Sequence, residues 1–127
     1  MVNKQRPLSP HLQIYKPQLT SVLSILHRMT GICLSVALFG FVYWLYLLSS
    51  HEKCFVCTLQ FFQTIWGKGL FAAGLFSFFY HLFNGLRHLM WDAGKGLTLT
   101  SVYQSGYLVL CLTLASTILT LCSLWFA

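Results

Sequence analysis

The chain has 127 residues, of which 57% are hydrophobic and 17% aromatic, while only 8% are charged. A soluble domain of this length does not need so apolar a composition, so these values exclude an ordinary soluble enzyme and predict an integral membrane protein. The net charge of +6 is a feature shared with nucleic-acid-binding proteins, but the placement of the basic residues argues for a membrane topology instead.

The first twenty residues contain all three prolines and no continuous apolar core. Proline fixes the backbone and lacks an amide hydrogen, so we expect residues 1–20 to be an extended segment at the inner membrane surface. Thr20 or Ser21 would then cap the first helix. The segment resembles neither a signal peptide nor a transit peptide, which favours a bacterial or organelle-encoded protein over an imported precursor.

Three charge-poor stretches follow, and each is long enough to cross about 30 Å of hydrocarbon as a helix. We expect helices over about residues 21–48, 64–91 and 102–125, with glycines after residue 92 ending the second. The predicted fold class is all-α, an up-down-up three-helix membrane bundle that forms a single anchor domain over residues 1–127.

The basic residues concentrate on one side of these spans, with four before or at the start of the first span and two near the end of the second. By the positive-inside rule, the N-terminus faces the cytoplasm of a bacterial inner membrane or the matrix of a mitochondrial inner membrane. The residues on this side are Lys4, Arg6, Lys16, Arg28, Arg87 and Lys95, whereas Lys53 and Lys68 lie on the other side with Glu52.

The loop between the first two spans contains one CxxC pair, Cys54 and Cys57. A structural zinc site needs four ligands, and the sequence has no second pair of this kind. We therefore expect a surface thiol pair rather than a metal site.

The second span carries a stripe of small and polar residues around His81. An ionisable group at a helix centre costs about 2.5–3.5 kcal/mol in lipid, so such residues usually mark a functional site. His81 lies about 9 Å inward from Arg87, and a neutral imidazole beside glycines suits a haem iron. The alternative is a histidine that hydrogen-bonds to a neighbouring helix. At 100° per residue the stripe contains Gly74, Ser77, His81, Gly85, His88 and Asp92, with Asn84 beside it.

The other histidines are poorly placed to be a second ligand of the same iron. His88 is about 10.5 Å from His81 along the same side of one helix. His27 is expected at the depth of Arg87, where it would suit a propionate or a quinone. A second axial ligand would therefore come from another polypeptide, which predicts an obligate partner.

The first span repeats the pattern, since Ser24, Arg28, Gly31 and Ser35 share one face with His27 at its border. A hydroxyl and a guanidinium one turn apart can bind a quinone carbonyl oxygen and steer protons. The alternative is that Arg28 is a surface anchor whose side chain extends to the lipid headgroups.

Two motifs carry a resemblance to a known family. One begins at Arg6-Pro7 and ends in Ser24-x-x-His27-Arg28-x-Thr30, and the other is His81-x-x-x-Gly85-Leu86-Arg87-His88-x-x-Trp91-Asp92-x-Gly94. They resemble the cytochrome b membrane-anchor subunit of succinate:quinone oxidoreductase, respiratory complex II.

The resemblance implies a role for each matching residue. His81 would be an axial ligand of haem b, with the other ligand from a second small anchor subunit. His27, Arg28 and His88 would lie near the haem propionates, and Ser24 and Arg28 would line the ubiquinone pocket. The iron–sulfur subunit would help to form that pocket and would dock on residues 6–17, and electrons would come from succinate through the flavoprotein subunit. The chain alone would catalyse nothing.

Three alternatives remain at this point. A fumarate reductase anchor would run the electron flow in reverse. A small proton- or ion-conducting protein would use His81, Asn84 and His88 as a relay. A structural membrane protein would hold no cofactor.

Overall fold

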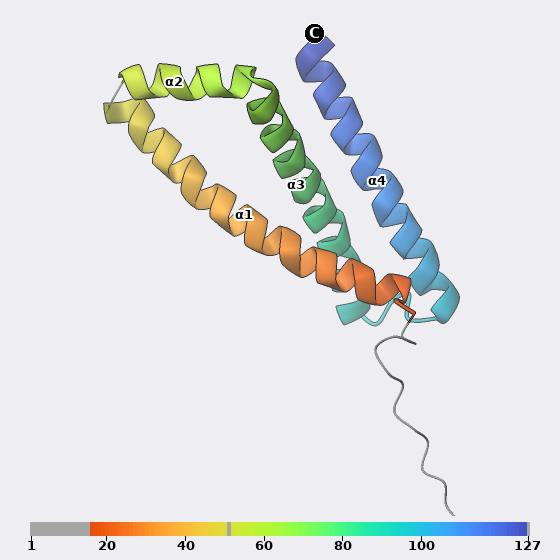
Figure 1. Cartoon of the computed structure of the whole chain (residues 1–127). Helices are drawn as coiled ribbons and strands as arrows, with labels where there is room; N and C mark the ends of the chain where they lie inside the picture. The colour runs from red at the N-terminus through yellow and green to blue at the C-terminus, as the bar shows by residue number, and fades with distance from the viewer. Residues whose placement is uncertain (1–15, 51, 127) are drawn as a thin grey trace, which may run out of the picture.

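The computed structural model describes residues 16–50 and 52–126, which form four helices and contain no strand (Figure 1). The helices are α1 (Leu19–Ser50), α2 (Glu52–Gln63), α3 (Ile65–Asp92) and α4 (Leu99–Phe126). Three of them, α1, α3 and α4, are long and apolar enough to cross a membrane. The predicted all-α membrane fold is therefore confirmed, and the long helices differ from their expected bounds by at most three residues.

The three long helices meet at one end of the molecule and separate toward the other (Figure 1). We call the first the joined end, where α1 begins, α3 ends and α4 begins. At the opposite open end, α1 has diverged from α3, and α2 lies across the gap between them. Helix α3 runs opposite to α1 and α4, as an up-down-up arrangement requires.

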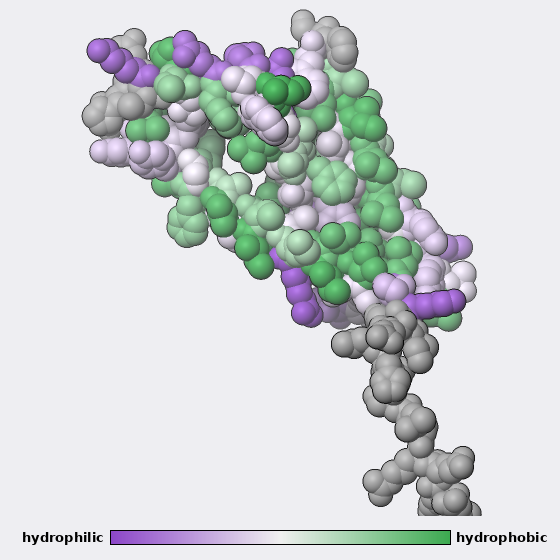
Figure 2. Space-filling view, viewed as in Figure 1, coloured by the Kyte–Doolittle hydropathy of each residue, from purple (hydrophilic) through white to green (hydrophobic). Residues whose placement is uncertain are grey.

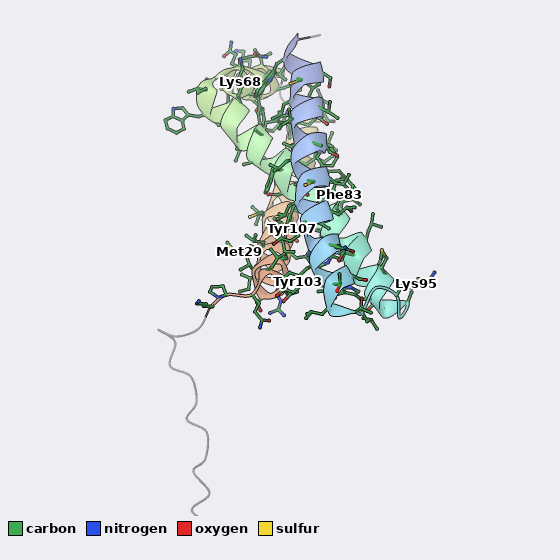
Figure 3. All side chains as sticks on the ribbon, turned by 90° about the vertical axis from the view of Figure 1, so that its right-hand side faces the viewer. Met29, Lys68, Phe83, Lys95, Tyr103 and Tyr107 are labelled. Carbon is green, nitrogen blue, oxygen red and sulfur yellow. The ribbon has the colours of Figure 1, made fainter. Side chains whose placement is uncertain are left out.

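The buried apolar core of the described residues is small and lies toward the joined end. It consists of Leu23, Tyr80 and Val109, each at most 2% exposed, with Leu19, Phe83 and Leu110 packed against them. Apolar residues instead cover much of the visible surface between two more hydrophilic ends (Figure 2). Figure 3 places Lys68 and Lys95 at these opposite ends. This distribution fits a protein whose solvent is lipid.

The segment between the first two spans differs from the expected outer loop, because it is the helix α2. No glycine or proline occurs between residues 41 and 66, so nothing in the sequence stops a helix from forming there. Thr64 then separates α2 from α3 and caps α3, its hydroxyl accepting a bond from the Gly67 amide at 3.1 Å.

The glycines after α3 end that helix as predicted. Gly94 and Gly96 have backbone φ values of 72° and 73°, which residues other than glycine rarely adopt. The Gly94 amide bonds the Trp91 carbonyl at 2.8 Å and the Lys95 amide bonds the Met90 carbonyl at 3.0 Å.

The start of α1 differs from its predicted capping. The helix begins at Leu19, and the Val22 amide bonds the Gln18 carbonyl at 3.1 Å. Thr20 and Ser21 therefore lie inside the helix and do not cap it. Most of the predicted extended segment over residues 1–20 lies outside the described residues.

Candidate functional site

Three histidines from two helices come together toward the joined end. The rings of His27 on α1 and His81 on α3 are stacked, with centroids 4.0 Å apart and planes 7° from parallel. The ring of His88 lies 5.2 Å from that of His27. The prediction that His27 lies at the depth of Arg87 rather than His81 is therefore wrong.

The depth error comes from counting residues inward from the charged positions. His27 lies about 12 Å along α1 from Leu19, and His81 lies about 16 Å along α3 from Asp92, at 1.5 Å per residue. These depths are similar once the observed helix ends are used, and α1 is inclined to α3 (Figure 1). The histidine of α1 therefore reaches the histidine in the interior of α3.

The hydrogen bonds of His81 define which ring nitrogen carries the hydrogen. Its Nδ1 lies 3.2 Å from the His27 carbonyl oxygen and 3.3 Å from Thr30 Oγ1. A carbonyl oxygen can only accept, so Nδ1 must donate, and in a neutral ring Nε2 then has the lone pair. Metal-binding histidines commonly have this arrangement. The expected alternative, a bond to a neighbouring helix, is thus present, and it leaves the other nitrogen available.

Two glycines allow the helices to approach at this point. A Cβ on Gly31 would lie 3.0 Å from His81 Cε1, and one on Gly85 would lie 3.7 Å from His27 Cε1. At the other end of the predicted stripe, Gly74 has nothing within 4 Å of its Cβ position, and the Ser77 hydroxyl bonds the carbonyl of Ala73. The stripe therefore meets α1 only in its joined half, because α1 diverges beyond it.

Arg87 is buried, with 3% of its surface exposed, and it joins α3 to α4. Its Nε donates to Ser105 Oγ at 3.0 Å, and its two terminal nitrogens donate to the Val102 carbonyl at 2.9 Å and to Asn84 Oδ1 at 3.3 Å. Its guanidinium carbon also lies 4.1 Å from the centre of the Trp91 ring. Arg87 was expected among the charges that flank the membrane, but in the structure it is a buried donor of hydrogen bonds within the protein.

Two further buried polar side chains adjoin the site: Asn84, which the sequence placed beside the stripe and in the relay alternative, and Tyr80, which it did not single out. Asn84 is 0% exposed and lies between Arg87 and His88, with its Nδ2 3.5 Å from His88 Nε2. Tyr80 is 1% exposed and donates to the Leu23 carbonyl of α1 at 2.8 Å. The signal for Tyr80 in the sequence was weak, because it adjoins the histidine stripe but does not belong to it.

Ser24 and Arg28 lie one turn apart on α1, as predicted from their spacing. Ser24 is half-buried and Arg28 is exposed. Neighbouring Met29 lies in the joined half, on the part of the molecule where Tyr103 and Tyr107 of α4 are also found (Figure 3). In contrast to Arg87, Arg28 has its guanidinium available for a molecule from outside the chain.

The described residues contain no group of three or more histidine, cysteine, aspartate or glutamate side chains arranged to hold a metal ion. Cys57 on α2 is free and exposed, consistent with a surface thiol.

Comparison with known proteins gives a consistent picture along nearly the whole chain. Residues 2–120 match the family model described as the succinate dehydrogenase/fumarate reductase transmembrane subunit. A succinate dehydrogenase cytochrome b556 subunit of Rickettsia felis is 42% identical over 120 residues, covering 94% of this chain and 91% of the relative. A cytochrome b560 subunit of Reclinomonas americana is 41% identical, with coverages of 93% and 85%. The human mitochondrial cytochrome b560 subunit is 44% identical, with coverages of 91% and 69%.

Proposed function

Because the chain belongs to the succinate dehydrogenase/fumarate reductase transmembrane subunit family, we propose that it anchors a succinate:ubiquinone oxidoreductase in the membrane and binds haem b together with a second anchor subunit. The observation that carries the proposal is the state of His81, an imidazole within a membrane-spanning helix whose Nδ1 donates to a backbone carbonyl. In the neutral ring, the remaining nitrogen would supply the lone pair that an iron ligand needs.

The donor set fits a haem held between two chains. His81 would supply one axial nitrogen, and the second would come from the partner anchor, since His27 stacks on His81 and His88 lies on the same helix. His27, Arg28 and His88 would bind or orient the propionates. When bound, haem would supply one-electron redox chemistry.

Ser24 and Arg28 would form this chain's part of the ubiquinone site. The exposed guanidinium of Arg28 would donate to a quinone carbonyl oxygen, and the hydroxyl of Ser24 would donate to the same oxygen or pass it a proton. Their support is position: the two groups lie one turn apart on α1 and near the histidine cluster. The iron–sulfur subunit and the second anchor would complete the pocket.

The assembly would also contain the flavoprotein subunit, which oxidises succinate. The joined end, which contains Arg28 and Lys95, would face the cytoplasm or the mitochondrial matrix, where the soluble subunits dock. The names of the curated relatives favour succinate oxidation over fumarate reduction, although the family model covers both. Family membership likewise favours an anchor over a small ion-conducting protein.

The proposal is tested by purifying the wild-type complex and a His81→Ala variant in mild detergent. The wild type should bring with it a flavoprotein and an iron–sulfur protein and should give a reducible b-type spectrum. His81→Ala should lose that spectrum, because no other described residue takes the same position. Ser77→Ala is the matched control, since this hydroxyl on the same helix bonds the Ala73 carbonyl.

Two results would contradict the proposal. A normal haem content and spectrum in His81→Ala would refute the ligand assignment. A wild-type chain that purifies without haem or soluble subunits, as an oligomer of itself, would favour the ion-conducting protein instead.

A further inference from the structure

Thr30 is a buried hydroxyl on α1 that faces His81 on α3. It is 8% exposed, and its Oγ1 lies 2.9 Å from the carbonyl oxygens of both Leu26 and His27. It also lies 3.3 Å from His81 Nδ1. A hydroxyl has one hydrogen and two lone pairs. Because both carbonyl contacts need that hydrogen, the oxygen presents a lone pair to His81.

His81 Nδ1 therefore meets two acceptors that come from a single turn of α1. The His27 carbonyl oxygen is 3.2 Å away and Thr30 Oγ1 is 3.3 Å away. Both contacts require Nδ1 to carry the hydrogen, so they select the same tautomer. They also resist rotation of the ring, because a flipped ring would present carbon to both acceptors.

Gly31 limits the position of the ring from the same helix. Its missing Cβ would lie 3.0 Å from His81 Cε1 and 3.6 Å from Nδ1. A contact of 3.0 Å is too close for a carbon pair, so a larger residue would displace the ring. Thr30 and Gly31 are adjacent in the sequence, and together with the His27 carbonyl they form a seat for the imidazole.

We propose that Thr30 is a positioning residue for His81, which fixes the tautomer and orientation of the ring through its hydroxyl and thereby tunes the bound iron. The inference rests on the proposed function, since it needs His81 to be the axial ligand. When the ring nitrogen that does not bind iron, here Nδ1, donates a hydrogen bond, the ligating nitrogen Nε2 becomes more basic. A more basic ligand stabilises ferric over ferrous iron, so loss of the bond should raise the midpoint potential.

The test uses the assembled complex with three substitutions in this chain. Thr30→Val removes the hydroxyl while keeping the shape, and Thr30→Ser keeps the hydroxyl. Thr117→Val is the matched control, because Thr117 is 7% exposed and its hydroxyl bonds the Thr113 carbonyl of its own helix at 2.7 Å. The readouts are the haem content, the midpoint potential from a redox titration, and the low-temperature paramagnetic resonance spectrum of the ferric haem.

We expect Thr30→Val to retain haem and to shift the potential upward. A tenfold loss of preference for the ferric form would appear as about 59 mV for one electron. Thr30→Ser should return the potential and spectrum to the wild-type values, and Thr117→Val should not change them. An unchanged potential in Thr30→Val, or an equal shift in Thr30→Ser, would overturn the proposal.

If Thr30→Val does not assemble, the smaller Thr30→Ala replaces it as the variant without a hydroxyl, and Gly31→Ala tests the ring position with the hydroxyl still present. The added methyl group should displace the His81 ring and change the ferric spectrum. An unchanged spectrum would show that Gly31 does not limit the position of the ring. Failure here is distinguishable from failure of the proposed function. A normal haem spectrum in His81→Ala refutes the assignment of His81 as the ligand. Loss of haem in His81→Ala, together with a wild-type potential and spectrum in Thr30→Val, refutes only the role of Thr30.

Discussion

Arg28 and Arg87 have opposite environments, although both belong to apolar helices. Arg28 is exposed, whereas Arg87 is 3% exposed and donates to Ser105, Val102 and Asn84. A guanidinium stays charged in proteins and needs partners when buried. Arg87 therefore holds α4 against α3, whereas Arg28 remains exposed on α1.

Replacing Arg87 with methionine should destabilise the assembled complex. The change leaves the buried Asn84 Oδ1 without its donor and removes the bonds from α3 to Ser105 and Val102 of α4, and an unsatisfied buried polar group costs about 1–3 kcal/mol. We expect a lower thermal midpoint in a melting experiment on the purified complex. Lys95→Met, which removes an exposed cation, is the control, and equal melting of the two variants would refute the internal role of Arg87.

Replacing Ser24 with alanine should weaken quinone reduction. Loss of one hydrogen bond contributing about 1 kcal/mol predicts a fall of about fivefold in kcat/KM for ubiquinone. The rate is measured with succinate and a soluble quinone, and it is compared with the dye-dependent rate of the same preparation. The control is Ser35→Ala, which removes an exposed hydroxyl further along α1. If this change gave the same loss, the effect would not be specific to the proposed site.

At the scale of elements, the turn between α2 and α3 depends on a glycine that sequence analysis did not single out. A Cβ on Gly67 would contact the Phe61 carbonyl oxygen and would lie 2.7 Å from the Phe62 Cα. Both neighbours are backbone atoms, so they cannot move aside as a flexible side chain would. The direction in which α2 crosses the open end is therefore tied to this position.

We expect Gly67→Ala to lower the thermal midpoint of the complex by the equivalent of about 1–3 kcal/mol, as overpacking does. The control is Gly69→Ala, two residues further on in α3, where nothing lies within 4 Å of the Cβ position. That change should be neutral or slightly stabilising, since alanine favours a helix over glycine by up to about 1 kcal/mol. Similar melting of the two variants would show that the turn adapts without cost.

The sequence predicts those features that depend on the residues of a single helix. The three spans depend on length and hydropathy, and the end of α3 depends on Gly94 and Gly96. It does not predict features that arise between helices: the stacking of His27 on His81 and the burial of Arg87 both depend on how α1 and α4 approach α3. Helix α2 was missed because its amphipathic sequence is short and adjoins a charged turn.

At the scale of the whole molecule, α1 is the least covered span. In an apolar 18-residue stretch of each span, no residue of α1 is buried, whereas 11% of the stretch in α3 and 17% of that in α4 are buried. It also diverges from α3 toward the open end (Figure 1). Lipid can cover such a surface, but the proposed second anchor subunit would cover part of it as well, and the two cases predict different behaviour.

If the second anchor packs on this chain, expressing the chain without it should give a less stable protein even in lipid. We expect a lower thermal midpoint and faster proteolysis in nanodiscs than for the chain in the complex, because the buried core of Leu23, Tyr80 and Val109 is small. A chain that is equally stable alone in nanodiscs would indicate that lipid suffices. Because the second ligand of the haem iron is proposed to come from the partner anchor, that isolated chain should also bind haem more weakly than the complex.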